Sequence, residues 1–497
     1  MKLKKFSHKT IIMSQQSLKD KTIKGTAWSA ADAFLGQGVT FLVGIVLARL
    51  LSPDEYGLIG ICLIFTTVLN GIVDSGFSNA LIRKKDIKDV DYNTMFITNM
   101  TISMVLYVLL FVCAPMVSVF FSRPELTDLI RVVGLILFAN ALSITQVTIL
   151  TKRIDFKTKT KASLTSAILS GIIGIVMAFL GFGVWSLVGQ MLSKQILYTC
   201  CLWILNKWWP SFTFSSKSFH YMWGFGWKLM LSGLLNNIWN QLYQVVVGRC
   251  YSPATLGQFT KSNEYAGIFS SNLSTIIQRV SYPVLSELQD DKERMVEGYR
   301  SVIKMTMFIT AICMLSLGAI SEPLLYCMIG SQWHEAATYM PLICISMSLY
   351  PLHAINLNML QVLGRSDIFL YLEIIKKIIG LVPICIGIFV DIYWMLFVSI
   401  ITGILSLYFN SWYTGKVLGY TFWKQLRDIA PSFGIALIIA ISVYFFKYLP
   451  ISNWGILPIQ IFVGLAVCIV TCQMTKIEEY KEVNTIIIKS INRLRNI

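Results

Sequence analysis

The chain has 497 residues, of which 55% are hydrophobic and 14% are charged, and its formal net charge is +16. Soluble domains carry about a quarter charged residues, so this composition excludes an ordinary soluble protein and favours a membrane protein. Apolar runs of about 20 residues recur along the whole chain, and a run of that length crosses a bilayer as a helix. The cysteines and histidines form no metal-ligand spacing, so we expect no metal or cofactor.

Hydropathy predicts about fourteen membrane-spanning helices. Their approximate ranges are 27–48, 56–76, 94–120, 127–150, 163–181, 184–205, 222–248, 257–281, 302–328, 336–361, 368–390, 392–415, 430–448 and 455–475. The first run is too long for a signal-peptide core, so we expect it to be retained. The predicted fold class is therefore an all-α polytopic membrane protein. The longest loops, near 206–221 and 282–301, are both short.

One motif occurs twice, once after the first span and once after the seventh. Arg49-Leu-Leu-Ser-Pro-Asp-Glu-Tyr-Gly57 is matched by Arg249-Cys-Tyr-Ser-Pro-Ala-Thr-Leu-Gly257, with Arg, Ser-Pro and Gly in the same register. We interpret this as an internal duplication. Because six spans separate the copies, both units have the same orientation, and a pseudo-two-fold axis along the membrane normal relates them.

The duplication predicts the domain organisation. We expect an N-terminal tail at 1–25, a six-helix lobe at 26–206, a linker at 207–221, a second six-helix lobe at 222–416, two further helices at 417–475 and a C-terminal tail at 476–497. Most of the 42 basic residues fall in the two tails and in alternate loops, which places both termini in the cytoplasm. The same asymmetry explains the positive charge by topology and by anionic lipid, and it argues against nucleic-acid binding.

Amide side chains recur inside the predicted spans. In the seventh span, Asn236, Asn240 and Gln244 stack on one helical face. The first and second spans carry Gln37 and Asn70. Such groups are costly against lipid, so they face protein or water. Two interpretations stay open: a hydrated cavity lined by spans 1, 2, 7 and 8, or interhelical hydrogen bonds in a packed bundle.

Ionisable residues at membrane depth indicate function by default. Asp32, Asp74 and Glu264 are candidates for ion coupling, and Lys194 and Arg279 are candidates for substrate contact.

Three further ionisable residues have competing interpretations. Arg49 and Arg249 end the first and seventh spans, where a guanidinium either contacts an anionic substrate or snorkels to the interface. His353 is either a packing residue or a proton carrier. The sequence shows no Walker loop, GxSxG or HExxH motif, so we expect a transporter and not an enzyme.

The two motif copies, extended to Leu47–Gly57 and Gly248–Gly257, resemble the signature of polysaccharide exporters in the multidrug/oligosaccharidyl-lipid/polysaccharide (MOP) superfamily. The stretch from Arg279 to Asp291 is similar to the segment after the eighth span in that family. The resemblance covers essentially the whole chain and is greatest to O-antigen and capsular repeat-unit flippases of the colanic-acid exporter type. It implies a MOP/MATE-like fold of two six-helix bundles with two additional helices.

The resemblance also implies a function. A polyprenyl-diphosphate-linked oligosaccharide would cross the bacterial cytoplasmic membrane by alternating access through a V-shaped cavity, for surface polysaccharide or lipopolysaccharide biosynthesis. Arg49 and Arg249 would contact its diphosphate or sugar. Membrane lipids and other glycan-assembly proteins are the expected partners. Two alternatives stay open: a MATE-type multidrug/cation antiporter, and an envelope glycan polymerase, ligase or glycosyltransferase.

Overall fold

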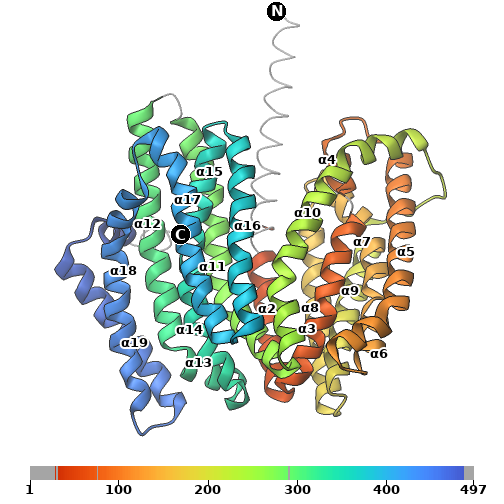
Figure 1. Cartoon of the computed structure of the whole chain (residues 1–497). Coiled ribbons are helices and arrows are strands. Elements are labelled where there is room, and N and C mark those ends of the chain that lie inside the picture. Colours follow the sequence, from red (N-terminus) through yellow and green to blue (C-terminus); the bar gives the residue numbers. More distant parts are fainter. Residues whose placement is uncertain (1–27, 29–31, 75, 289–290, 486–497) are drawn as a thin grey trace, which may run out of the picture. The chain divides into compact units, whose positions relative to one another are not determined.

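The computed structural model describes residues 28, 32–74, 76–288 and 291–485, except for the side chains of 33, 271–273, 275–284 and 366. The chain divides into two compact units, one ending at Gly257 and the other beginning at Gln258. Within the described residues, the regular elements of both units are helices (Figure 1).

The first unit is a helical bundle. Its elements are the π-helical turn η1 (Asp32–Gly36), α2 (Gln37–Leu50), α3 (Pro53–Asp74), α4 (Phe77–Arg83), α5 (Asp89–Phe121), α6 (Leu126–Val133), α7 (Ile136–Lys152), α8 (Phe156–Phe179), α9 (Val184–Asn206) and α10 (Ser216–Cys250). Helix α7 packs against α3, α5 and α9, and α10 packs along α3, α4 and α5. The first turn of α11 (Pro253–Glu287) also belongs to this unit.

The second unit continues α11 and adds helices of the same kind. They are α12 (Lys292–Ala319), α13 (Ser321–Ile329), η2 (Ser331–Trp333), α14 (His334–Ser348), α15 (Tyr350–Val362), α16 (Ser366–Phe389), α17 (Ile392–Leu418), α18 (Phe422–Tyr444), η3 (Phe445–Tyr448) and α19 (Asn453–Thr475). Helix α12 packs against α14 and α18, and α19 packs against α18.

Small residues allow close helix packing in the first unit. Ala162, Ser166, Ser170 and Gly174 recur at every fourth position of α8, and all four are buried. A Cβ atom on Gly174 would lie 2.6 Å from the Cβ of Gln190 on α9. Stripes of this kind are typical of helices that associate in membranes, because they let the backbones approach closely.

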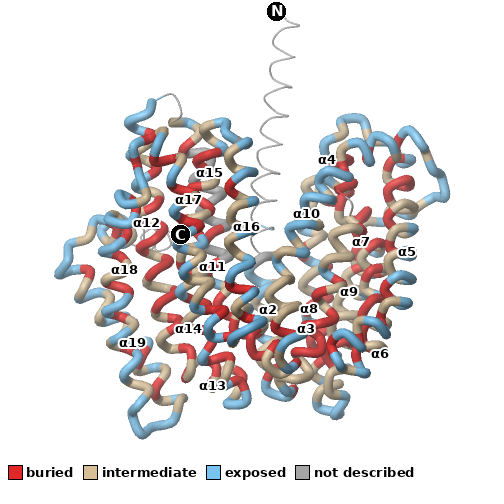
Figure 2. Tube along the Cα trace, viewed as in Figure 1, coloured by how far each residue is buried: buried red, intermediate tan, exposed pale blue. Residues whose placement is uncertain are grey.

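Many large apolar side chains are exposed on the outer surface of the bundles. Figure 2 marks the exposed positions in pale blue. Val105, Val112 and Val119 repeat every seven residues on α5 and are 62%, 67% and 78% exposed. On α19, Phe462 and Leu465 are similarly exposed. A water-soluble protein rarely exposes so much apolar surface, whereas lipid accepts it. The chain is therefore a multi-pass membrane protein.

In the described part of the chain, each predicted span falls on one helical element or on two consecutive ones. Residues 27, 29–31 and 75 of the first two predicted spans lie outside the described residues. The ranges 127–150, 302–328 and 336–361 are each divided between two helices, α6 and α7, α12 and α13, or α14 and α15. In the described part, nine helical segments are long and apolar enough to cross a membrane. The all-α, polytopic fold is thus confirmed, and the number of fourteen spans stays a prediction.

One predicted loop differs from the structure. The loop expected near 282–301 is wrong, because α11 extends to Glu287 and α12 begins at Lys292. Asp291 caps α12, where its side chain accepts a hydrogen bond from the Arg294 N–H at 3.2 Å. Polar residues thus extend these helices beyond the apolar runs. The compact units divide after Gly257, because α10 packs on α3, α4 and α5. The division into two six-helix lobes with a linker at 207–221 stays a prediction.

The repeated motif starts a helix in both copies. Ser52 and Glu55 form a capping box at α3: Ser52 N–H donates to Glu55 Oε2 at 2.6 Å, and Glu55 N–H donates to Ser52 Oγ at 3.4 Å. In the second copy, Thr255 N–H donates to Ser252 Oγ at 3.1 Å. Each Ser-Pro therefore fixes the start of the helix that follows the motif.

The glycines of the two copies bring the starts of α3 and α11 together within the first unit. A Cβ atom on Gly57 would lie 1.7 Å from the carbonyl oxygen of Pro253, and one on Gly257 would lie 2.0 Å from that of Pro53. The two copies therefore contact each other reciprocally, backbone to backbone. Only glycine fits at either position.

Candidate functional site

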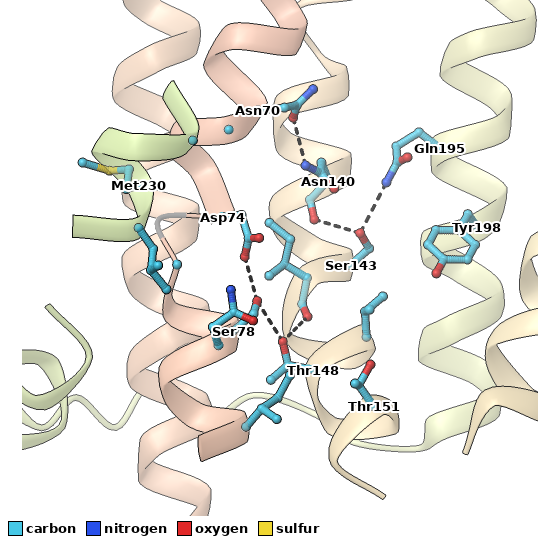
Figure 3. A pocket seen from close by; sticks show the side chains of 18 residues that line it. Asn70, Asp74, Ser78, Asn140, Ser143, Thr148, Thr151, Gln195, Tyr198 and Met230 are labelled. Carbon is cyan, nitrogen blue, oxygen red and sulfur yellow. Dashed lines mark hydrogen bonds between the residues drawn. The ribbon is translucent and has the colours of Figure 1, made fainter. Parts of the chain in front are cut away.

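A pocket of about 640 Å³ lies within the first unit, between α3, α4, α7, α9 and α10 (Figure 3). Its polar lining consists of Asn70, Asp74, Ser78, Asn79, Asn140, Ser143, Thr148, Thr151, Gln195 and Tyr198. Residues 140, 143, 148 and 151 follow one face of α7, since they are spaced by three, five and three positions. The pocket is thus a polar site inside an apolar bundle.

Amide and hydroxyl groups join three helices at this pocket. Asn140 Nδ2 on α7 donates to Asn70 Oδ1 on α3 at 2.9 Å. Gln195 Nε2 on α9 donates to Ser143 Oγ at 3.3 Å, and Ser143 Oγ donates to the carbonyl oxygen of Asn140 at 2.8 Å (Figure 3). These bonds fix the side chains in place but leave part of each amide available to a ligand.

Asp74 contributes the carboxylate of the pocket. Ser78 Oγ donates to Asp74 Oδ1 at 2.7 Å, and Thr148 Oγ1 donates to Ser78 Oγ at 3.1 Å. Gly76, with a φ of 67°, turns the chain between α3 and α4 and so returns Ser78 to Asp74. A side chain at Gly76 would approach the carbonyl oxygen of Gly226 to 2.8 Å, so the turn also needs glycine for space.

The pocket lies at the basic end of the first unit. Ile82 and Thr151 line it, and the adjacent Lys152 donates through Nζ to the Ile82 carbonyl oxygen at 2.7 Å. None of the eighteen described lining residues is Lys, Arg or His. The pocket therefore offers neutral donors and acceptors and one carboxylate.

Asn70 and Asp74 are the sequence-predicted candidates that the structure brings together in this pocket. Lys194 and Asp32 lie elsewhere in the first unit. Lys194 Nζ donates to Thr40 Oγ1 on α2 at 3.1 Å. Asp32 lies in η1, and its Oδ1 is buried with no hydrogen-bond partner among the described residues. π-Helical turns often accompany functional sites, so Asp32 stays a candidate.

Arg49 and Arg249 lie in the last turns of α2 and α10 and are exposed. A cation at a helix C-terminus interacts favourably with the helix dipole, which gives both residues a structural reason for their position. The Arg249 guanidinium also lies 5.3 Å from the centre of the Phe120 ring. Neither residue lines the pocket. Both earlier interpretations of the two arginines therefore stay open.

The amides of α10 do not share one environment. Asn236 and Asn240 are exposed, as is Gln37 on α2, and Gln244 is half-buried. Asn237 instead packs on α3, where its Nδ2 would lie 2.6 Å from a Cβ atom at Gly71. The substrate role of the exposed amides stays a prediction.

Two candidates in the second unit have other surroundings. Glu264 Oε2 lies 2.7 Å from Lys261 Nζ, so an ion pair already engages this carboxylate. His353 Nδ1 lies 3.0 Å from Asn410 Nδ2, which supports a packing role. The side chain of Arg279 lies outside the described residues. Among the described residues, no group of His, Cys, Asp or Glu could hold a metal ion.

Sequence reasoning missed Asn140, Ser143, Thr148 and Gln195. The spacing of Asn140, Ser143 and Thr148 on α7 was the available signal, but apolar residues of the same helix lie between them and hide the pattern. Gln195 is a single amide on α9. Its importance follows only from its place beside Ser143.

A family model and a relative of known name both associate this sequence with polysaccharide biosynthesis proteins. The family model described as "Polysaccharide biosynthesis protein" matches residues 46–338. The succinoglycan biosynthesis transport protein ExoT of Rhizobium meliloti (strain 1021) is 24% identical over 359 residues, which are 72% of this chain and 73% of ExoT.

Two solved structures share the fold. The lipid II flippase MurJ in an inward closed conformation aligns with a TM-score of 0.69 and 16% identity, over 93% of this chain and 99% of MurJ. An inward-facing multidrug resistance MATE family transporter of the MOP superfamily aligns with a TM-score of 0.59 and 16% identity, over 79% of this chain and 95% of the transporter. The predicted MOP/MATE-like fold is therefore confirmed.

Proposed function

This chain belongs to the polysaccharide biosynthesis protein family, and we propose that it is a flippase for a polyprenyl-diphosphate-linked oligosaccharide. It acts in the bacterial cytoplasmic membrane during assembly of a surface polysaccharide. The observation that carries the proposal is a polar pocket inside an apolar membrane bundle of this family. The role of ExoT as a succinoglycan biosynthesis transport protein and the MurJ-like fold support it.

The physical task of such a flippase is to shield polar groups from hydrocarbon. A hydroxyl group transferred into an apolar medium without a hydrogen bond costs about 2–7 kcal/mol, so an oligosaccharide does not cross a bilayer unaided at a useful rate. Side chains that replace water at these hydroxyls lower the barrier, while the lipid tail stays in the bilayer. Alternating access would then release the head group on the other side.

The orientation of the chain follows from its basic residues. With both termini in the cytoplasm, the end of the first unit that carries Arg83, Lys84 and Lys152 faces the cytoplasm. The pocket lies at this end, so it would receive the substrate from the cytoplasmic leaflet.

In this proposal Arg49 and Arg249 contact the diphosphate during translocation. Guanidinium presents a planar fork of donors that matches phosphate oxygens, and its charge is fixed. The exposed amides Asn236 and Asn240 and the half-buried Gln244 contribute polar surface to the path of the head group. Lys194 is a weaker candidate, because it already donates to Thr40.

A MATE-type antiporter has less support. Such a transporter would use acidic residues to bind cations, and one of the three candidates, Glu264, is already paired with Lys261. The MATE alignment at 16% identity supports the fold alone. Asp32 and Asp74 remain available to couple an ion to glycan transport.

Deletion of the gene tests the proposal. Cells without the protein should lose the surface polysaccharide and accumulate its lipid-linked repeat unit, and the wild-type gene should restore both. Unchanged surface glycan and lipid intermediates, together with increased sensitivity to cationic drugs, would instead support the antiporter.

A further inference from the structure

The charge of the pocket excludes the most anionic part of the proposed substrate. None of its eighteen described lining residues is cationic, and Asp74 forms no ion pair with the described side chains. A diphosphate placed there would meet a carboxylate and only neutral donors. Buried phosphate oxygens are instead stabilised by Arg or Lys.

The hydrogen-bonding groups suit a neutral ligand with many hydroxyls. Each amide has two N–H donors and a carbonyl acceptor with two lone pairs. The bond between Asn140 and Asn70 uses one donor of the first and one lone pair of the second. Gln195 uses one donor toward Ser143, and Asp74 accepts from Ser78. The remaining donors and acceptors can pair with hydroxyl groups, which both donate and accept.

The shape of the pocket suits rings that are polar at the edge and less polar on the face. Its volume of about 640 Å³ lies within the range of small-molecule sites. Tyr198, Leu229 and Met230 add aromatic and apolar surface to the amides. A sugar ring has C–H groups that pack on such surface and hydroxyls that reach the polar groups beside it.

We infer that this pocket binds sugar residues of the transported oligosaccharide through their hydroxyl groups, whereas the diphosphate binds outside it. The inference rests on the proposed flippase function and specifies what one site within it recognises. Asn70, Asn140 and Gln195 would then determine glycan specificity, and Asp74 would accept from a hydroxyl group.

Gly233 on α10 permits a direct test, because it lines the pocket and a Cβ atom there would meet nothing within 4 Å. Gly233→Leu would therefore fill the pocket without a clash at the backbone. Gly224 is the matched control: it lies on the same helix, is also exposed, has equally open surroundings and does not line the pocket. Leu is a better helix former than Gly, so neither change weakens α10.

The experiment measures binding to the full-length protein in detergent with two probes. One is the lipid-linked oligosaccharide extracted from cells that lack the gene, and the other is undecaprenyl diphosphate without sugar. Gly233→Leu should weaken binding of the lipid-linked oligosaccharide about tenfold or more, to a level near that of undecaprenyl diphosphate. Binding of undecaprenyl diphosphate should not change, and Gly224→Leu should behave as wild type with both probes.

Two results would overturn the inference: wild-type binding of the lipid-linked oligosaccharide by Gly233→Leu, or an equal loss of both probes. If the chain is not a flippase for lipid-linked oligosaccharide, the experiment gives a result that differs from both of these. In that case cells without the gene accumulate no lipid-linked oligosaccharide, and the wild-type protein binds neither the lipid-linked glycan fraction of a polysaccharide-producing strain nor undecaprenyl diphosphate.

Discussion

The polar side chains of α7 and α15 occupy equivalent spans of the duplicated chain but have different surroundings. On α7, Asn140 is half-buried beside a pocket, and its bond to Asn70 leaves donors and acceptors available. On α15, Asn356 is fully buried. Its Nδ2 donates to the Leu352 carbonyl oxygen at 2.9 Å and to Gln425 Oε1 at 3.1 Å.

The acceptor side of Asn356 is also occupied. Tyr299 Oη donates to Asn356 Oδ1 at 2.6 Å, and Gln425 Nε2 donates to the same oxygen at 3.1 Å. The donors and the acceptor of Asn356 on α15 are thus all used in bonds between helices or within α15. The amide of Asn140 on α7 can still bind a ligand. An amide in a membrane helix therefore indicates a site only when part of its hydrogen-bonding capacity remains open.

The largest effect is expected for the hydrogen-bonded group of Asn356, Tyr299 and Gln425. Asn356→Leu would remove the Asn356 hydrogen bonds of the buried Gln425 amide and Tyr299 hydroxyl, and each buried group that loses its partner costs about 1–3 kcal/mol. For the two groups together we expect the protein to lose about 2–6 kcal/mol of stability, measured by thermal unfolding in detergent. Tyr299→Phe removes a single bond and should cost less. Normal stability with lost export would show that this network, too, acts as a site.

The second prediction extends the comparison to the arginines, whose environment is more open than that of either amide. Arg49→Ala or Arg249→Ala should impair export ten- to a hundredfold, because a charge-assisted contact contributes about 1.5–3 kcal/mol. Arg49→Lys and Arg249→Lys should retain part of the export, because lysine keeps the positive charge but lacks the two parallel N–H donors of a guanidinium group. Export of lipid-linked glycan is measured at equal membrane abundance. Wild-type export by both Ala variants, singly and combined, would exclude the proposed contact.

The third prediction concerns Asn140, whose amide keeps donors and acceptors available in the pocket. Asn140→Leu should reduce glycan export about tenfold through loss of one or two hydrogen bonds to the substrate. Its thermal stability should change little, because water in the pocket can satisfy the exposed part of Asn70. Asn140→Gln keeps the carbonyl oxygen and the NH2 group of the amide and should therefore retain more export. A large loss of stability with proportionate loss of export would mean that α7 and α15 do not differ in the proposed way.

The smallest effect is expected at a polar contact nearer the surface. Arg294 Nε on α12 lies 3.5 Å from Asp291 Oδ2, and the two side chains are 76% and 53% exposed. Exposed ion pairs contribute about 0–1 kcal/mol, so Arg294→Ala should lower stability by less than about 1 kcal/mol. Unchanged export would place this pair with the structural contacts. A strong loss of export at normal stability would give the start of α12 a functional role.

The sequence was sufficient to predict an all-α, polytopic fold, because apolar runs of membrane length can be read directly along the chain. It also placed Asn70 and Asp74 among the candidates. It could not predict the pocket, because Asn140, Gln195 and Asn70 meet only when α3, α7 and α9 pack together. For the same reason it did not distinguish Asn140 from Asn356. The difference between these amides depends on neighbours that are far away in the chain.

The contact between the starts of α3 and α11 makes each motif copy depend on the other for space. A methyl group on Gly57 would have to move the Pro253 backbone by well over an ångström, and the reverse holds for Gly257 and Pro53. Neither copy can therefore accumulate larger residues while the other stays unchanged.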